Sequence, residues 1–173
     1  MSARSCLILG GARSGKTKRA LDLAAPFCER FYIATAEALD KEMADRISHH
    51  KAERAGKGWI TIEAPLELPE AISGIRAAEA VCVVDCLTLW LSNLMGAGRD
   101  VERATAHLCD AVKASTATVL LVSNEVGLGL VPETPLGREF RDRQGWLNQA
   151  VAATVDEVEF VTAGLPLRIK PAS

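Results

Sequence analysis

The chain has 173 residues and a formal net charge of −2 at pH 7, with 20 basic and 22 acidic residues interspersed along it. This balance excludes the basic footprint of a nucleic-acid-binding protein, and the longest apolar runs are too short to cross a bilayer. The N-terminal segment runs into glycines and shows no signal peptide, and five cysteines spread through apolar segments favour reduced, buried thiols. We therefore expect one domain over residues 1–173, in the cytoplasm.

The predicted secondary structure alternates strands and helices throughout. Continuous apolar runs rich in β-branched residues are typical of the central strands of a parallel sheet. In chain order the sequence predicts strands at 5–9, 31–35, 59–65, 80–87 and 117–127, and a pair of short strands around Gly164 within 157–170. It predicts helices at 18–28, 37–54, 69–79, 101–115 and 137–155, with Asp100 as the cap of the fourth. The expected fold class is α/β, with a mostly parallel sheet covered by helices on both faces.

The segment Gly10–Thr17, with the sequence GGARSGKT, lies between the first strand and the first helix. It fits the pattern G-x-x-x-x-G-K-[ST], in which backbone amides and a helix N-terminus surround a phosphate group. Lys16 is expected to reach the β- and γ-phosphates, and the hydroxyl of Thr17 to bind Mg²⁺. Arg13 adds a positive charge near the γ-phosphate. The predicted nucleotide-binding residues of this loop are Gly10, Gly11, Ala12, Arg13, Ser14, Gly15, Lys16 and Thr17.

A carboxylate at the end of a buried strand is the expected second ligand of the Mg²⁺ ion. The segment VCVVD supplies Asp85, and Glu125, near the end of the strand predicted at 117–127, is a second acidic residue. Because ligands of open α/β sheets bind at the carboxyl ends of the strands, Thr35, Asp85 and Glu125 should gather at that edge.

Two of the three histidines, His49 and His50, are adjacent on the predicted helix 37–54. At about 100° per residue, His50 falls on the apolar stripe of this helix, whereas His49 falls roughly 120° away among acidic residues. His49 is therefore free to act as a nucleophile on phosphorus, with Lys51 and Arg54 close by to neutralise phosphates. A solvated surface histidine remains the alternative interpretation on helix position alone.

Four segments together resemble a known family. They are residues 7–17, 32–54 with its HHK, 83–94, and 122–149 with NEVGLGLVPE. This sequence is similar to the bifunctional adenosylcobinamide kinase/adenosylcobinamide-phosphate guanylyltransferases of cobalamin biosynthesis, over nearly the whole chain.

The resemblance implies a P-loop, RecA-like fold, Mg²⁺ dependence and a homotrimer. It implies that ATP or GTP phosphorylates adenosylcobinamide, and that GTP then donates GMP through a guanylyl-histidine at His49 to give adenosylcobinamide-GDP. Lys16 is the second catalytic residue of this assignment, and Thr17 and Asp85 are the metal ligands. Beyond the glycine loop, the nucleotide contacts implied by the family are Ala34, Thr35, Ala36, His50, Lys51, Ala52, Glu53, Glu63 and Asp85.

Two other functions, a helix movement and the role of three arginines remain open at this point. A plain small-molecule kinase would leave His49 without a role, and a nucleotide-dependent switch would need the guanine-reading N-K-x-D stretch that this sequence lacks. Running both reactions at one loop predicts a movement of the helix 37–54 about a hinge at 55–58. Arg138, Arg141 and Arg143 either bind the phosphate of the corrinoid or merely solvate a helix.

Overall fold

The structure is a computed structural model that describes residues 4–37, 41 and 56–171. Within these residues the chain forms a seven-stranded sheet with the order β3-β2-β4-β5-β1-β6-β7. All neighbouring strands are parallel except β7, which runs antiparallel to β6. The strands are β1 (Ser5–Gly10), β2 (Arg30–Ala34), β3 (Trp59–Glu63), β4 (Val81–Asp85), β5 (Thr118–Asn124), β6 (Glu157–Thr162) and β7 (Leu165–Lys170).

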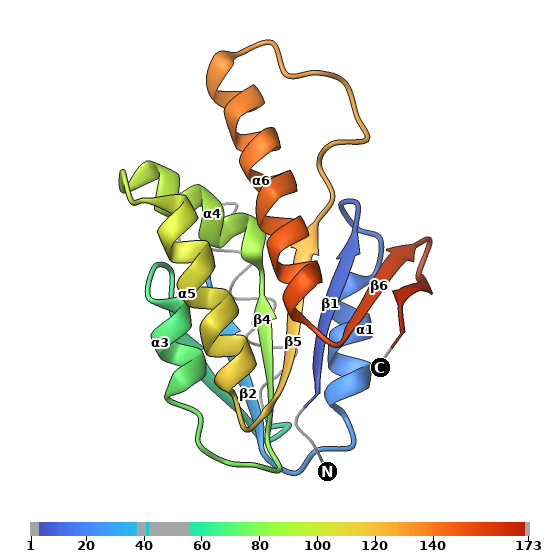
Figure 1. Cartoon of the computed structure of the whole chain (residues 1–173). Helices are drawn as coiled ribbons and strands as arrows, with labels where there is room; N and C mark the ends of the chain where they lie inside the picture. Colours follow the sequence, from blue (N-terminus) through green and yellow to red (C-terminus); the bar gives the residue numbers. More distant parts are fainter. Residues whose placement is uncertain (1–3, 38–40, 42–55, 172–173) are drawn as a thin grey trace.

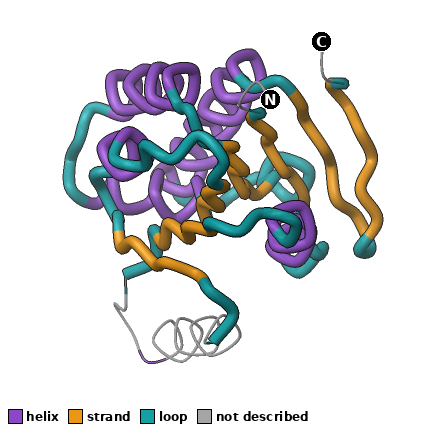
Figure 2. Tube along the Cα trace, turned by 90° about the horizontal axis from the view of Figure 1, so that it is seen from below, coloured by secondary structure: helices purple, strands orange, loops and turns teal. Residues whose placement is uncertain are grey.

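Helices cover both faces of this sheet, as Figures 1 and 2 show. One apolar cluster joins one face of the sheet to the helices that follow β3, β4 and β5, and a second cluster packs α1 on the other face. The helices are α1 (Lys16–Ala24), α3 (Leu68–Ser73), α4 (Leu87–Gly96), α5 (Val101–Ala114) and α6 (Pro135–Thr154). The predicted fold class, a mostly parallel α/β sheet between layers of helices, is confirmed.

Several predicted boundaries were wrong for local reasons. The helix expected at 18–28 begins at Lys16 and ends at Ala24, just before Pro26, whose ring nitrogen has no hydrogen to donate. The helix expected at 69–79 ends at Ser73, where Gly74 follows. Helix α6 begins at Pro135, because the hydroxyl of Thr134 caps it by accepting from the amide of Gly137 at 3.1 Å.

Two other local predictions were right, and a third was right only in part. Asp100 caps α5, accepting a hydrogen bond from the amide of Arg103 at 2.9 Å. The helix predicted at 137–155 is observed, and it continues through Gly145. Cys6, Cys82 and Cys86 are buried free thiols, whereas Cys28 is exposed, contrary to the expectation of buried thiols throughout. The predicted helix at 37–54 lies outside the described residues except at positions 37 and 41, whereas positions 56–58 of the predicted hinge are described and form a turn.

Candidate functional site

The glycine loop joins β1 to α1 and lies at the carboxyl edge of the sheet. Gly10 is required there, because a Cβ atom at this position would approach the carbonyl oxygen of Val161 to 2.3 Å and Ser14 Oγ to 2.6 Å. Gly15 has φ of +102°, a left-handed conformation that favours glycine, and immediately precedes the first turn of α1. The loop amides are therefore held close to a helix N-terminus, the arrangement that binds phosphate.

Lys16 is the first residue of α1, and its side chain lies back over the loop. Only 7% of Lys16 is exposed, and its Nζ donates a hydrogen bond to the carbonyl oxygen of Gly11 at 2.5 Å. Burial lowers the pKa of Lys16 from its ordinary value, while Cys86 and Asp85 act in the opposite direction. A buried ammonium group beside phosphate-binding amides is suited to an anion that replaces its lost hydration.

Thr17 and Asp85 meet between α1 and the end of β4. The hydroxyl of Thr17 donates to Asp85 Oδ2 at 2.9 Å, and the hydroxyl of Tyr32 donates to the same oxygen at 2.7 Å. The structure therefore brings Asp85 into contact with the glycine loop, as the sequence predicted. Tyr32 on β2 was not singled out from the sequence, although its place two residues before the end of a strand beside β4 could have drawn attention to it.

The donor set fits a magnesium-bound triphosphate. Mg²⁺ in such sites takes one or two protein oxygens, with phosphate oxygens and water completing an octahedron, and the Thr17 hydroxyl and Asp85 carboxylate offer two. Among the described residues, no cluster of three or more His, Cys, Asp or Glu side chains could hold a metal without such help. Among these described residues, the buried Ser14 Oγ has no hydrogen-bond partner, so this polar atom inside the loop is available to bond a ligand.

The other residues predicted for this edge lie along it. Thr35 is fully buried, and its hydroxyl accepts from the amide of Cys86 and donates to the carbonyl of Cys86, both at 2.8 Å. Thr35 therefore fixes the chain directly after Asp85. The amide of Glu125 donates to the carbonyl of Gly10 at 3.0 Å, which ties the end of β5 to the start of the glycine loop. The predicted gathering of Thr35, Asp85 and Glu125 is thus observed.

The remaining predicted contacts are farther out or outside the described residues. Ala34 ends β2, Ala36 follows Thr35, and Glu63 ends β3 opposite Ala34 in the register of the two strands. His49 lies outside the described residues, as do His50, Lys51, Ala52 and Glu53. Their roles stay predictions.

The three arginines of α6 are all engaged within the chain. Arg138 donates to the carbonyl oxygens of Pro132 and Glu133, Arg141 pairs with Asp142, and Arg143 pairs with Glu139 and Glu102. Arg143 also lines a cavity of about 750 Å³ between α4, α5 and α6, together with Met95 and Phe140. Binding of the corrinoid phosphate by these arginines remains untested.

Two polar networks were not anticipated from the sequence. Behind β5, Gln144 and Asn148 of α6 form buried hydrogen bonds with Ser123, and Asn148 also donates to the carbonyl of Asn124 at 3.1 Å. On the α1 side of the sheet, Arg19 forms two hydrogen bonds of 2.7 Å with the buried Glu159 of β6. Neither network follows a short sequence motif, because each joins residues distant in the chain.

The fold and the loop together define a P-loop nucleotide-binding α/β protein. The chain belongs to the family of cobinamide kinase/cobinamide phosphate guanyltransferases, whose sequence pattern matches residues 6–169. It is 44% identical over 168 residues to the bifunctional adenosylcobalamin biosynthesis protein CobP of Pseudomonas aeruginosa, which covers 95% of this chain and 96% of the relative. Identity to the corresponding protein CobU of Salmonella typhimurium is 40% over 179 residues, covering 95% of this chain and 98% of the relative.

This chain is accordingly a cobinamide kinase and cobinamide phosphate guanylyltransferase of adenosylcobalamin biosynthesis, as the sequence resemblance implied. The family match removes the support for a plain kinase or a switch. Its fold is similar to that of EscN, an ATPase of the type III secretion system of enteropathogenic Escherichia coli, with a TM-score of 0.57 at 10% identity over 93% of this chain and 43% of EscN. This likeness bears on the RecA-like fold alone. In the part of the chain that the structure describes, no helix is long and apolar enough to cross a membrane.

Proposed function

We propose that both reactions use the glycine loop, and that GMP passes through His49 on its way from GTP to the acceptor. The observation that carries this proposal is the hydrogen bond of 2.9 Å between Thr17, the residue directly after the buried Lys16, and Asp85. It supports a site for the β- and γ-phosphates of a nucleoside triphosphate with Mg²⁺. ATP and GTP both fit such a site, because the loop contacts phosphates rather than the base.

In the kinase reaction, the hydroxyl oxygen of the aminopropanol arm of cobinamide attacks the γ-phosphorus. The bond from this phosphorus to the β–γ bridging oxygen breaks, the nucleoside diphosphate leaves, and the hydroxyl gives up its proton. Lys16 and the loop amides bind the phosphate oxygens on which negative charge builds up. Thr17 and Asp85 would hold Mg²⁺, which supplies charge neutralisation between the β- and γ-phosphates.

In the transfer reaction, an imidazole nitrogen of His49 attacks the α-phosphorus of GTP, and pyrophosphate leaves. A phosphate oxygen of adenosylcobinamide phosphate then attacks the same phosphorus, the P–N bond breaks, and the imidazole is restored. The loop that bound the β- and γ-phosphates in the first reaction is suited to hold the departing pyrophosphate. Its contacts therefore serve both reactions, while the reacting phosphorus differs.

Further nucleotide contacts at Ala34, Thr35, Ala36, Glu63 and residues 50–53 belong to the same proposal and rest on the family pattern. So does the homotrimer. Support for self-association comes from large apolar side chains exposed on the β5–α6 loop, Leu128 at 82% and Leu130 at 96%. We also predict that the helix bearing His49 moves between the two steps. A cross-link between this helix and α1 tests this prediction, because retention of both activities in the cross-linked protein would contradict it.

The test of the histidine uses GTP labelled at the α-phosphate, incubated with the full chain and Mg²⁺ and then denatured. A phosphoramidate survives alkali and is lost in acid, so we expect acid-labile label on the wild-type protein and none on His49→Ala. His107→Ala, at the third histidine of the chain and exposed on α5, is the control and should keep the label.

Label retained on His49→Ala and lost on His50→Ala would move the nucleophile by one residue. An unlabelled wild-type protein that still makes GMP-linked product would mean direct transfer without a covalent histidine.

A further inference from the structure

Strand β6 and the turn after it contact the glycine loop at two points and the following helix α1 at a third. At the start of the loop, a Cβ atom on Gly10 would lie 2.3 Å from the carbonyl oxygen of Val161. In the middle, the amide of Gly164 donates to the carbonyl of Ser14 at 2.9 Å. One helical turn beyond Gly15, the guanidinium of Arg19 binds the Glu159 carboxylate through two bonds of 2.7 Å. The start and the middle of the loop and the helix that follows it are therefore supported from the same side.

The Arg19–Glu159 pair holds the first turn of α1, the turn that carries Lys16 and Thr17. The amide of Arg19 donates to the carbonyl of Gly15 at 2.9 Å, so its backbone belongs to the first hydrogen-bonded turn of the helix. A bidentate Arg–carboxylate pair fixes direction as well as distance. Because Glu159 lies on a strand paired with both β1 and β7, it fixes this turn relative to the sheet.

Burying the charged carboxylate of Glu159 costs free energy, so stabilisation of the fold alone does not account for the Arg19–Glu159 pair. Glu159 is 2% exposed, and buried ion pairs often stabilise a fold no better than apolar side chains of equal volume. The hydrogen bonds from Arg19 lower the pKa of Glu159, against the opposing effect of burial, so the pair is charged at neutral pH.

We propose that Glu159 and Gly164 are positioning residues for the nucleotide: through Arg19 and Ser14 they fix the glycine loop and the first turn of α1 in the phosphate-binding geometry. This inference rests on the loop being the nucleotide site of both reactions. In this proposal neither residue contacts the nucleotide: Gly164 acts through the glycine loop and Glu159 through the first turn of α1.

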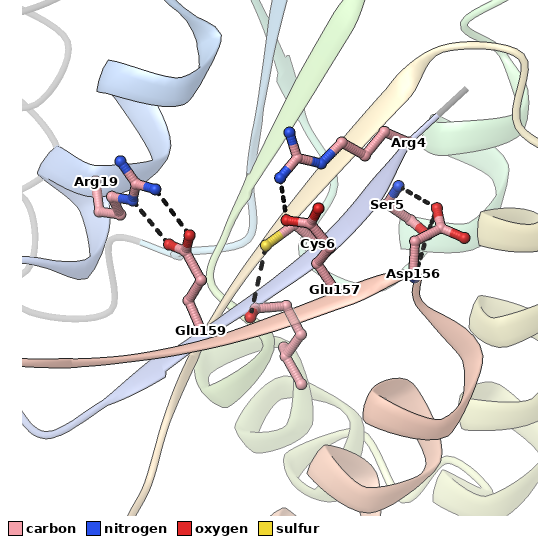
Figure 3. A network of polar contacts seen from close by, with 8 residues as sticks. Arg4, Ser5, Cys6, Arg19, Asp156, Glu157 and Glu159 are labelled. Atoms are coloured by element: carbon pink, nitrogen blue, oxygen red, sulfur yellow. Dashed lines mark hydrogen bonds and ion pairs between the residues drawn. The ribbon is translucent and has the colours of Figure 1, made fainter. Parts of the chain in front are cut away.

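Strand β6 supplies its own matched control, shown in Figure 3. Glu157 lies two residues before Glu159, is 3% exposed, and pairs with Arg4 near the N-terminus. Both carboxylates flank Cys6, and burial together with their charges raises the pKa of that thiol to about 12. The two pairs thus share a strand, a sheet face and nearly the same burial, but Arg4 precedes β1 whereas Arg19 belongs to α1.

The first test compares Glu159→Gln with Glu157→Gln in the full chain, measuring KM for GTP, KM for cobinamide and thermal stability. Both variants should lose similar stability. Glu159→Gln should raise KM for GTP by about tenfold in both reactions, as expected for a weakened set of charged hydrogen bonds, and leave KM for cobinamide unchanged. Glu157→Gln should keep KM for GTP within about twofold of wild type. An equal rise in both variants, or none in Glu159→Gln, overturns the proposal.

A second test does not depend on removing a buried charge. Gly164 has φ of +78° and Gly98 has φ of +63°, and at both positions a Cβ atom would meet nothing within 4 Å. Alanine at either site therefore imposes similar backbone strain. Gly164→Ala should raise KM for GTP several-fold, because it disturbs the bond to Ser14, whereas Gly98→Ala, in the turn between α4 and α5, should not. Equal KM values in the two variants contradict the positioning role.

The variant Lys16→Met distinguishes failure of the positioning role from failure of the proposed nucleotide site. If Lys16→Met abolished both activities while Glu159→Gln and Gly164→Ala left KM for GTP unchanged, the loop would be the nucleotide site and β6 would only support the fold. If Lys16→Met left both activities intact, the site itself would be wrong, and the positioning role would fall with it.

Discussion

The loops after the neighbouring strands β1 and β5 lie at the same edge of the sheet, but they are stabilised differently (Figure 1). The glycine loop is short, and it accepts hydrogen bonds from Gly164 in the turn after β6 and from Glu125 directly after β5. Among the described residues, the side-chain hydrogen bonds of the β5–α6 loop lie near its ends, where the amide of Gly127 donates to the Glu125 carboxylate and Arg138 donates to the carbonyls of Pro132 and Glu133. Its middle carries Leu128, Leu130 and Val131, which are between 63% and 96% exposed.

This difference separates the glycine loop, whose surroundings are supplied by the same chain, from the β5–α6 loop, whose apolar side chains are left exposed. Buried polar groups in the glycine loop can form hydrogen bonds with a phosphate, whereas exposed leucines are buried by contact with another apolar surface. We infer that nucleotide binding belongs to the first loop and that the second serves assembly or the large acceptor. The following predictions test that division, from the largest expected effect to the smallest.

Lys16→Met should reduce both activities by about 10²–10³-fold, because both reactions need the charge that binds the β- and γ-phosphates. It should also raise the melting temperature of the nucleotide-free protein. The pKa of Lys16 is lowered by burial, so below its ordinary value of 10.5 the folded state holds the proton less well than the unfolded state, and protonation costs stability. The apolar methionine removes this cost.

Two assays decide this prediction: steady-state rates of the kinase and transfer reactions, and a thermal melt at pH 7 without nucleotide. Loss of activity with a lower melting temperature would mean that Lys16 supports the fold. Loss of the kinase activity alone would mean that guanylyl transfer takes place elsewhere.

Replacing Leu128 and Leu130 together by serine should convert the proposed trimer into monomers, since their side chains are the most exposed of the large apolar residues described. Light scattering behind a sizing column gives the mass directly. The matched control is Leu165→Ser with Leu167→Ser on β7, where both side chains are also exposed, at 71% and 63%.

If the β7 double variant dissociated and the loop variant did not, the interface would lie at the edge of the sheet. If neither changed in mass, the exposed leucines of the loop would be left for the acceptor, and KM for cobinamide should then rise in the loop variant.

The sequence was informative about the first loop because its chemistry is local. Gly10, Lys16 and Thr17 are in one motif, and Asp85 ends a strand whose apolar run is plain to read. The start of α1 was misplaced by two residues, because the glycine loop itself provides the N-terminal boundary at Gly15.

Contacts between distant residues were beyond the sequence. Arg19 and Glu159 are 140 positions apart, and their pairing depends on β6 lying beside β1, a strand order that no local pattern specifies. Tyr32 was missed for the same reason, since its partner Asp85 lies on another strand 53 positions away. Alternation of apolar residues indicates which faces are buried, but not which strands are neighbours.

Tyr32→Phe should have the smallest effect of these changes and the most specific one. The hydroxyl of Tyr32 donates to Asp85 Oδ2 at 2.7 Å, so its loss leaves the carboxylate less firmly oriented without changing its charge. We expect the Mg²⁺ concentration for half-maximal kinase rate to rise roughly three- to tenfold, the equivalent of one hydrogen bond. At saturating Mg²⁺ the KM for GTP should match wild type, because the glycine loop is untouched. A rise in KM for GTP that excess Mg²⁺ did not reverse would instead place Tyr32 against the nucleotide, and would widen the glycine-loop site to include β2.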